Sequence, residues 1–429
     1  MTNLDDICAS LRAASTRLAL QSAEEKNRAL LAVRDSIDSQ RDSILQANAR
    51  DVERARSGGM SEPLIARLAL SGKGIDEILA ALSALAEQTD PIGQVVAGWS
   101  VPNGLGIRQV RVPLGVAAVI YESRPNVTVD AFALAYKSAN AVLLRGSSSA
   151  LESNRALVAA IKAGLAASGG EADAVELSEP DGASHADVDW ILAARGKIDI
   201  ALPRGGASLI RRVVETARVP VIETGAGVCH LYVDPTADLG MAVRIADNAR
   251  VQKPAACNSL DCVLVHRDRA AEFFPALAAS LSRHEAKTGK PGGVEFRCDA
   301  RSLAALAGSG ANAVAATEED WGFEFLDYVL ACRVVDSLDE AIDFINAHGT
   351  RHSETIVTES RAAARSFQAR VDAACVYVNA SPRFTDGGQF GLGAEIGIST
   401  QKLHARGPMG LTALTTTKYL VEGEGQVRP

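Results

Sequence analysis

Long hydrophobic runs, paired cysteine motifs and an excess of positive charge are all missing from this 429-residue sequence. No segment offers the roughly 18 uninterrupted apolar residues of a membrane-spanning helix, and the first ten residues hold Asp5 and Asp6 instead of the basic stretch of a secretion signal. The seven cysteines are odd in number and lack CxxC spacing, which argues against a disulfide framework and a zinc ribbon. A net charge of −8 disfavours nucleic acid as a partner. We expect a cytoplasmic protein that binds neither a membrane nor nucleic acid.

The chain is long enough for two or three domains, and its hydrophobic pattern changes along its length. Up to about residue 97 the apolar residues repeat at helical intervals, as Ile7, Leu11, Ala14 and Leu18 do. From Gly115 onwards, short β-rich runs alternate with helical stretches, which is typical of parallel sheets. We expect strands at 116–121, 141–145, 198–202, 219–223, 230–233, 262–265, 329–335, 354–357 and 374–378. We expect helices at 127–138, 150–166, 183–194, 206–217, 236–250, 268–283, 337–347 and 360–370.

This alternation occurs in two blocks and predicts two doubly wound α/β domains that join near residues 224–230. The stretch 98–113 and the tail after about residue 408 fit neither block. Both could be strands that leave the body of the fold.

Cys257 is the first candidate for chemistry, because it lies in a loop of small residues directly before an expected strand. Small neighbours leave a sulfur approachable, and nearby polar groups favour its thiolate form. From this loop alone, the alternative is a buried thiol that only fills space. Glu223 ends an expected strand at the carboxyl edge of a sheet, where it could act as a base or touch a cofactor, or be a solvated acid.

The glycine-rich stretch around Gly205 and Gly206 follows one expected strand and begins a helix, whose free N–H groups attract phosphate. No GxGxxG occurs, so the usual dinucleotide fingerprint is missing. Arg145 ends another strand and could reach a ribose or its phosphate, unless it is a plain surface arginine.

A long polar run at 385–409 carries Lys402, His404 and Arg406. Long loops inside compact domains are usually functional. Its cations could bind an anionic substrate, or the run could only position an oligomerisation strand. His404 has no partner at metal-ligand spacing, so we expect no metal site.

Several long strings resemble one family: YESRPNVT at 121–128, VIETGAGVCH at 221–230, YVNAS at 377–381, RFTDGGQFGLGAE at 383–395 and STQKLHARGPMG at 399–410. Together they are similar to the γ-glutamyl phosphate reductases of the aldehyde dehydrogenase superfamily, over nearly the whole chain. The resemblance implies an NADP-binding domain at 1–97 and 114–227, a catalytic domain at 228–407 and a small β oligomerisation element at 98–113 and 408–429.

The resemblance also implies roles for the candidate residues. Cys257 would be the nucleophile, and Asn126 would donate its amide N–H to the oxyanion together with the backbone N–H of Cys257. The cofactor-binding residues would be Arg145 at the adenosine ribose and Gly205, Gly206 and Ser208 at the pyrophosphate. One departure concerns 147–149, where three serines replace the family's usual glycine and acidic residue.

The implied reaction is the NADPH-dependent reduction of L-glutamyl 5-phosphate to L-glutamate 5-semialdehyde and phosphate through a cysteine thioester, the second step from glutamate to proline. Arg383, Lys402 and Arg406 are the candidates for binding the anionic substrate. The role of Glu223 stays open between cofactor contact, proton handling and structure. A homo-oligomer is expected, and contact with glutamate 5-kinase is possible.

Three rival functions remain. The nearest is an NAD(P)-dependent aldehyde dehydrogenase that oxidises a semialdehyde to the acid, with Glu223 as the hydrolytic base. The second is a cysteine hydrolase or acyltransferase that needs no nicotinamide. The third is a structural protein without enzymatic activity.

Overall fold

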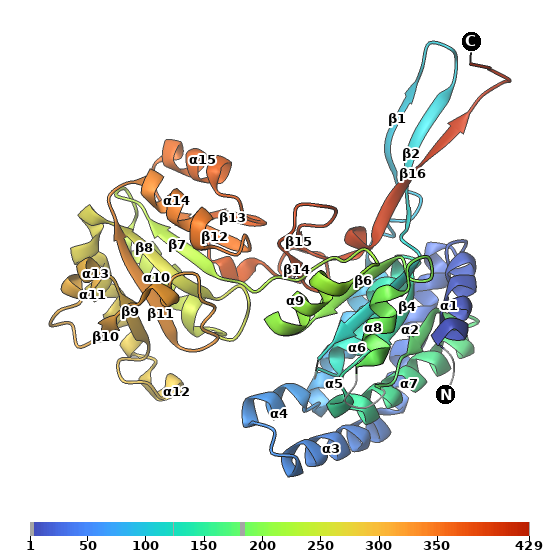
Figure 1. Cartoon of the computed structure of the whole chain (residues 1–429), viewed down its shortest axis with the longest axis horizontal. Helices are drawn as coiled ribbons and strands as arrows, with labels where there is room; N and C mark the ends of the chain where they lie inside the picture. The colour runs from blue at the N-terminus through green and yellow to red at the C-terminus, as the bar shows by residue number, and fades with distance from the viewer. Residues whose placement is uncertain (1–3, 123, 181–184, 429) are drawn as a thin grey trace. The chain divides into compact units, whose positions relative to one another are not determined.

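The computed structural model describes residues 4–122, 124–180 and 185–428, and the chain divides into two compact units (Figure 1). Unit 1 comprises Met1–Thr224, Gly391–Gly397 and Leu403–Pro429, and unit 2 comprises Gly225–Phe390 and Ile398–Lys402. Each unit contains its own parallel sheet. Two α/β regions were therefore correctly predicted from the alternating pattern.

Unit 1 begins with five helices, as the early helical spacing predicts. Ser22 and Glu25 form a capping box, which satisfies free N–H groups at the start of the second helix. The buried residues of the first helix include Leu11, Ala14 and Leu18, which lie on one face. The helices are α1 (Leu4–Leu18), α2 (Ala23–Ser39), α3 (Arg41–Ser57), α4 (Glu62–Leu68) and α5 (Gly72–Glu87).

The parallel sheet of unit 1 has four strands in the order β5-β4-β3-β6. Strands β3 and β4 are buried along their whole length, as expected of a sheet with helices packed on it. The strands are β3 (Val116–Tyr121), β4 (Ala141–Arg145), β5 (Val175–Leu177) and β6 (Ile200–Arg204). The helices that follow them are α6 (Asn126–Lys137), α7 (Leu151–Ser168), α8 (Ala186–Ala193) and α9 (Ala207–Thr216).

A three-stranded antiparallel sheet, which we call the arm, extends from the rest of unit 1 (Figure 1). It consists of β1 (Val95–Ser100), β2 (Gly106–Pro113) and β16 (Thr415–Glu422), with β2 in the middle. The two stretches that fitted neither α/β block thus pair with each other, with Thr415 opposite Pro113 and Glu422 opposite Gly106. All six residues of β1 are exposed.

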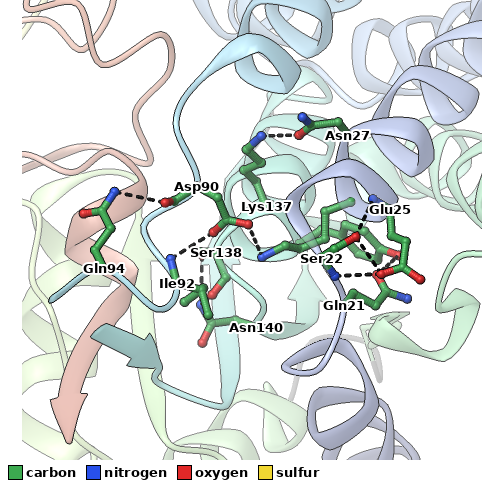
Figure 2. A network of polar contacts seen from close by, with 12 residues as sticks. Gln21, Ser22, Glu25, Asn27, Asp90, Ile92, Gln94, Lys137, Ser138 and Asn140 are labelled. Carbon is green, nitrogen blue, oxygen red and sulfur yellow. Dashed lines mark hydrogen bonds and ion pairs between the residues drawn. The ribbon is translucent and has the colours of Figure 1, made fainter. Parts of the chain in front are cut away.

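The root of the arm is tied to the helical body by a buried polar network (Figure 2). Asp90, in the segment that leads into β1, forms an ion pair of 2.5 Å with the fully buried Lys26 and accepts the amide N–H of Ile92 at 2.9 Å. The Nζ of Lys137 donates to the carbonyl of Ala86 at 3.0 Å. Asn140 donates to the carbonyl of Leu414, just before β16, at 2.9 Å. Both connections to the arm are therefore fixed to the same body.

Unit 2 contains a seven-stranded sheet in the order β10-β9-β11-β8-β7-β12-β13, and all its strand pairs are parallel. Its strands are β7 (Cys229–Val233), β8 (Leu260–His266), β9 (Glu295–Cys298), β10 (Asn312–Ala315), β11 (Val329–Val335), β12 (Ser353–Val357) and β13 (Cys375–Val378). Its helices are α10 (Leu239–Val251), α11 (Arg267–Ser282), α12 (Glu285–Thr288), α13 (Ala300–Ala305), α14 (Leu338–His348) and α15 (Arg361–Arg370). The two-residue strands β14 (Ile398–Ser399) and β15 (Gly407–Pro408) follow later in the chain.

Alternate residues of the central strands in unit 2 belong to different hydrophobic clusters. Leu231 and Val233 pack in one cluster with residues of α10 and α11, whereas Tyr232 packs in another with residues of α14 and α15. Because successive side chains of a strand point to opposite faces, helices must cover both faces of this sheet. The doubly wound layout is thus confirmed for unit 2.

Candidate active site

Cys257 lies in the loop between α10 and β8, and a buried arginine fixes that loop. Arg250, at the end of α10, donates to the carbonyl of Pro254 at 2.7 Å and to that of Leu260 at 2.7 Å. It also forms an ion pair of 2.7 Å with Asp261. Arg250 therefore holds both ends of the loop that carries Cys257.

Among the seven cysteines, Cys257 alone is half-buried, while the other six are buried. Its backbone is in close contact with the segment before β7. A Cβ added to Gly227 would lie 1.5 Å from the carbonyl oxygen of Cys257, so only glycine fits there. The thiol of Cys229 donates to the same carbonyl at 3.4 Å. The nucleophile candidate is thus a half-buried residue with a tightly packed backbone.

The chain returns to Cys257 after β13, through the segment 381–385. Asn258 donates its side-chain amide to the carbonyls of Arg383 at 3.2 Å and Thr385 at 2.8 Å. The Nε–H of Arg383 donates to Oε1 of Gln252 at 2.8 Å. Burial lowers the pKa of Arg383, and among its charged neighbours the Cys257 thiolate opposes this most strongly. Two of the predicted residues, Cys257 and Arg383, are therefore neighbours in unit 2.

A chain of buried hydrogen bonds supports this segment. The hydroxyl of Thr385 lies 2.7 Å from that of Tyr377 and 2.6 Å from that of Ser353. The Ser353 hydroxyl is in turn 2.8 Å from Nδ1 of His352. Burial lowers the pKa of His352 to about 4, so this imidazole is neutral at pH 7. These hydrogen bonds hold the segment 381–385 in place, and none of the groups that form them is charged at pH 7.

These groups lie at the amino edge of the sheet of unit 2. Cys257 precedes β8, Gly227 precedes β7, and His352 precedes β12. Ligands of open α/β sheets usually bind at the other edge, beyond the carboxyl ends of the strands. That general rule therefore does not predict the position of Cys257 in unit 2. The small-residue loop around Cys257, taken together with the family resemblance, is the signal that pointed to this candidate site.

Unit 1 brings other predicted residues to the carboxyl edge of its own sheet. The chain leaves β3 on one side for β4 and β5 and returns on the other side for β6, which is the arrangement at which such sheets bind ligands. Gly205 and Gly206 follow β6 there, and the amide N–H of Gly206 donates to Oε2 of Glu122 at 3.0 Å. A Cβ on Gly205 would lie 2.6 Å from the Glu122 carboxyl carbon. The first turn of α9 thus receives a carboxylate where the sequence predicts a phosphate, and Ser208 is exposed on this turn.

Asn126 and Glu223 lie at the same edge of unit 1. Asn126 is exposed at the start of α6, directly after β3, and donates to Oδ2 of Asp130 at 3.1 Å. Burial raises the pKa of Asp130 to about 6, and the hydrogen bond from Asn126 opposes the shift. Val221 bridges to Ala201 of β6 in parallel, which places the half-buried Glu223 level with the end of that strand. The roles predicted for Asn126 and Glu223 stay predictions.

Arg145 ends β4 at this edge, but it is buried and forms an ion pair with Asp187. Its Nε and Nη2 donate to the two carboxylate oxygens at 2.6 Å and 3.2 Å. One edge of the guanidinium, formed by Nε and Nη2, is therefore bound to Asp187. Contact between Arg145 and a ribose stays a prediction.

The remaining cations of the polar run lie in different places. Lys402 belongs to unit 2, is exposed and forms an ion pair of 2.7 Å with Asp372. Arg406 belongs to unit 1, where it lines an open groove of about 920 Å³ at the root of the arm, together with Arg111 and His404. Of the three predicted substrate-binding cations, Arg383 is the one that the structure places beside Cys257.

Sequence reasoning missed the residues that hold the nucleophile's loop and Arg383 in place: Arg250, Gln252, Asn258 and Thr385. In unit 1 it missed Glu122, which accepts the N–H of Gly206 at the start of α9. The proximity of Gln252 and Asn258 to Cys257 in the chain was the available signal. Nothing in the sequence pointed to Glu122 or to Arg250.

The described part of the chain contains neither a cluster of metal ligands nor a helix that could cross a membrane. Over residues 4–122, 124–180 and 185–428, no group of three or more His, Cys, Asp or Glu side chains could hold a metal ion. Within the same ranges, no helix combines the length and the apolar character that crossing a membrane requires.

Comparisons with known proteins find close relatives of the whole chain, although no protein-family model matches it. The chain is 59% identical to the gamma-glutamyl phosphate reductase of Treponema pallidum, over 99% of this chain and 100% of that one. The crystal structure of gamma-glutamyl phosphate reductase from Thermotoga maritima superposes with a TM-score of 0.93 at 44% identity, over 99% of both chains. An acetylating aldehyde dehydrogenase from Geobacillus thermoglucosidasius superposes with a TM-score of 0.67 at 14% identity, over 100% of both chains, and so shares the fold. The predicted aldehyde-dehydrogenase-like fold is confirmed.

Proposed function

The chain belongs to the γ-glutamyl phosphate reductase family, and we propose that it reduces L-glutamyl 5-phosphate with NADPH to L-glutamate 5-semialdehyde and phosphate. This reaction is the second step of proline biosynthesis from glutamate. The observation that carries the proposal is the pair formed by Cys257, the one cysteine of the seven that is not buried, and the neighbouring guanidinium of Arg383. An acyl phosphate needs a nucleophile for its carbon and a cation for its leaving group, and this pair provides both.

In the proposed mechanism, the Cys257 thiolate attacks the acyl carbon of the substrate. The new C–S bond forms as the C–O bond to phosphate breaks, and phosphate leaves with the bonding electrons. Arg383 stabilises the negative charge that this oxygen gains. A nicotinamide bound to the protein would supply a hydride to the thioester carbon. The C–S bond of the reduced adduct would then break, which releases the aldehyde and restores the Cys257 thiolate.

The cofactor would bind at the carboxyl edge of the sheet in unit 1. The residues there fit a dinucleotide, because Gly205 and Gly206 allow close approach of the backbone at a strand-order reversal. We propose that a pyrophosphate displaces the Glu122 carboxylate from the start of α9. Gly205, Gly206 and Ser208 would then contact it, and Arg145 would lie nearer the ribose.

The other catalytic and binding roles follow the same proposal. Asn126 would donate its amide N–H to the oxyanion, in place of its present bond to Asp130. Lys402 and Arg406 would contact charged groups of the substrate. Hydrolysis of the thioester would waste product in a reductase, so Glu223 would serve the cofactor, proton handling or structure.

The arm supports a homo-oligomer. Its exposed apolar side chains include Trp99, Tyr419 and Val421, and exposed apolar side chains on a sheet are typical of surfaces that bind another chain. A second copy of the chain would cover it. Contact with glutamate 5-kinase would shield the labile acyl phosphate from water.

The decisive experiment measures the reverse reaction of the purified protein with glutamate semialdehyde and NADP. We expect reduction of NADP only when phosphate or arsenate is present, because the thioester must be cleaved by an oxyanion. Turnover without phosphate would favour an aldehyde dehydrogenase that forms the free acid. Turnover of an acyl substrate without any change in NADPH would favour a cysteine hydrolase or acyltransferase.

The variant Cys257→Ala tests the nucleophile. We expect it to lose turnover while NADPH still binds and the far-ultraviolet circular dichroism stays unchanged. Cys262→Ala is the matched control, because that thiol is buried in β8. Catalysis retained in Cys257→Ala would remove Cys257 from the mechanism.

A further inference from the structure

The segment that carries Arg383 is attached to the nucleophile's loop on both sides of Cys257. Gln252, which caps α10, accepts the Nε–H of Arg383 at 2.8 Å. Asn258, directly after Cys257, donates to the main-chain carbonyls of Arg383 and Thr385 at 3.2 Å and 2.8 Å. The main chain and the guanidinium of Arg383 are thus fixed separately, each by a residue of the same loop.

The bond to Gln252 restricts how Arg383 can hold an anion. A guanidinium binds an oxyanion through two parallel N–H groups, and it has two edges that can do so. One edge uses Nε and one Nη, and the other uses both Nη atoms. Because Gln252 takes the Nε–H, the edge formed by the two Nη atoms is the one left for a phosphate.

We propose that Gln252 is a positioning residue, which holds the Arg383 guanidinium beside Cys257 so that its Nη edge receives the phosphate group of the acyl phosphate. This inference rests on the proposed function and adds the residue that orients the phosphate-binding cation. Gln252 itself touches neither the substrate nor the reacting atoms in this scheme. It acts through Arg383 alone.

Inorganic phosphate is the probe, because it is a substrate of the reverse reaction. In the oxidation of glutamate semialdehyde by NADP, we expect Gln252→Met to raise the KM for phosphate about fivefold and to leave kcat within about twofold. The side chain of methionine has a similar length but cannot accept the Nε–H. Gln389→Met, an exposed glutamine in the segment after Thr385, is the control and should change neither constant.

A double-mutant cycle separates positioning from general damage. In an Arg383→Met background, adding Gln252→Met should have no further effect on the KM for phosphate. An equal rise in both backgrounds, or no rise in the wild-type background, would overturn the proposal while the proposed function survives.

The second measurement does not depend on the reaction. Arg383 acts electrostatically on the Cys257 thiolate, so its displacement should slow the alkylation of Cys257 by iodoacetamide at pH 7 about threefold. Gln389→Met should alkylate at the wild-type rate. If the wild-type enzyme oxidises glutamate semialdehyde without phosphate, the proposed function is wrong. The alkylation rates then test the role of Gln252 by themselves. Equal alkylation rates in the wild type and Gln252→Met would then refute it.

Discussion

At the scale of single residues, the chemistry depends on how closely the backbone of Cys257 can be packed while its sulfur stays accessible. The contact with Gly227 sets that limit, since a Cβ there would lie 1.5 Å from the Cys257 carbonyl oxygen and 2.4 Å from its carbon. Both atoms belong to backbone, which cannot move aside as the end of a flexible side chain can. Any larger residue must therefore displace the nucleophile's loop.

We expect Gly227→Ala to lower kcat at least about 100-fold, because a shift of about 1 Å in a reacting group costs that much. The rate at which iodoacetamide alkylates Cys257 should also differ from the wild-type rate in this variant, because the loop that carries Cys257 is displaced. The control is Gly72→Ala at the start of α5, where an added Cβ would meet nothing within 4 Å. Steady-state kinetics with phosphate, NADP and glutamate semialdehyde give the comparison, and wild-type kcat in Gly227→Ala would contradict the packing argument.

At the scale of elements, the end of α10 determines where the loop lies. Arg250 is fully buried and bonds to three main-chain carbonyls and to Asp261. Burial raises the pKa of Asp261 to about 7, and Arg250 opposes this rise. The pair therefore stabilises the loop only while both partners are present.

We expect Arg250→Met to destabilise the protein by about 3 kcal/mol, because it leaves buried carbonyls and a buried carboxylate without their donor. Arg244→Met is the matched control, since Arg244 is exposed on the same helix. Urea denaturation followed by circular dichroism measures both. A loss below about 1 kcal/mol in Arg250→Met would mean that the loop is held by other contacts.

The start of β12 makes stability depend on pH. The pKa of His352 in the folded state is about 4, below its ordinary 6.5, because the ring is buried. Below pH 6.5 the unfolded chain binds a proton that the native state does not, so stability falls as the pH drops from 6.5 towards 4. By this linkage we expect His352 alone to contribute a loss of about 2 kcal/mol at pH 5 relative to pH 7.

His352→Gln should remove this part of the pH dependence, because glutamine does not titrate. His404→Gln, at an exposed histidine, should keep the wild-type slope. The measurement is the free energy of unfolding in urea at pH 7 and pH 5. Identical slopes in His352→Gln and wild type would show that another group carries the effect.

The secondary structure was predictable where apolar runs are long and was missed where they are short. The strands at 116–121 and 141–145 were predicted to the residue, because both are buried along their whole length. The strand predicted at 219–223 is wrong: only Val221 bridges to β6, and Pro220 directly before it has no N–H to donate to a ladder. Strands β9 and β10 have four residues each and include Arg297 and Asn312, so their pattern was too weak to detect.

The candidate site was predictable only in part, for a physical reason. Cys257 lies in a recognisable loop of small residues and Arg383 in a distinctive string, whereas the bonds of Gln252 and Asn258 to Arg383 join residues 131 and 125 positions apart. Such contacts depend on the chain doubling back after β13, where Asn379 takes a left-handed φ of 56°. No pattern of neighbouring residues in the sequence predicts this reversal of the chain.

At the scale of the whole molecule, two units with separate cores share one chain, and an exposed sheet extends from the first. In the arm, Trp99 and Tyr419 come from different strands and meet edge to face, with ring centroids 6.2 Å apart. They are 45% and 59% exposed. A face of this kind would be an aggregation hazard in a monomer, so its retention favours a defined partner.

We therefore expect the wild-type protein to form a dimer or a larger homo-oligomer at micromolar concentration. Trp99→Glu should shift it towards monomer, because a carboxylate would be buried without a partner in the interface. Leu20→Glu is the control, since Leu20 is an exposed apolar residue outside the arm. Sedimentation equilibrium measures all three proteins. Because association makes stability depend on concentration, the melting temperature of the wild type should rise with protein concentration, and that of Trp99→Glu should not. A monomeric wild type would contradict the predicted homo-oligomer.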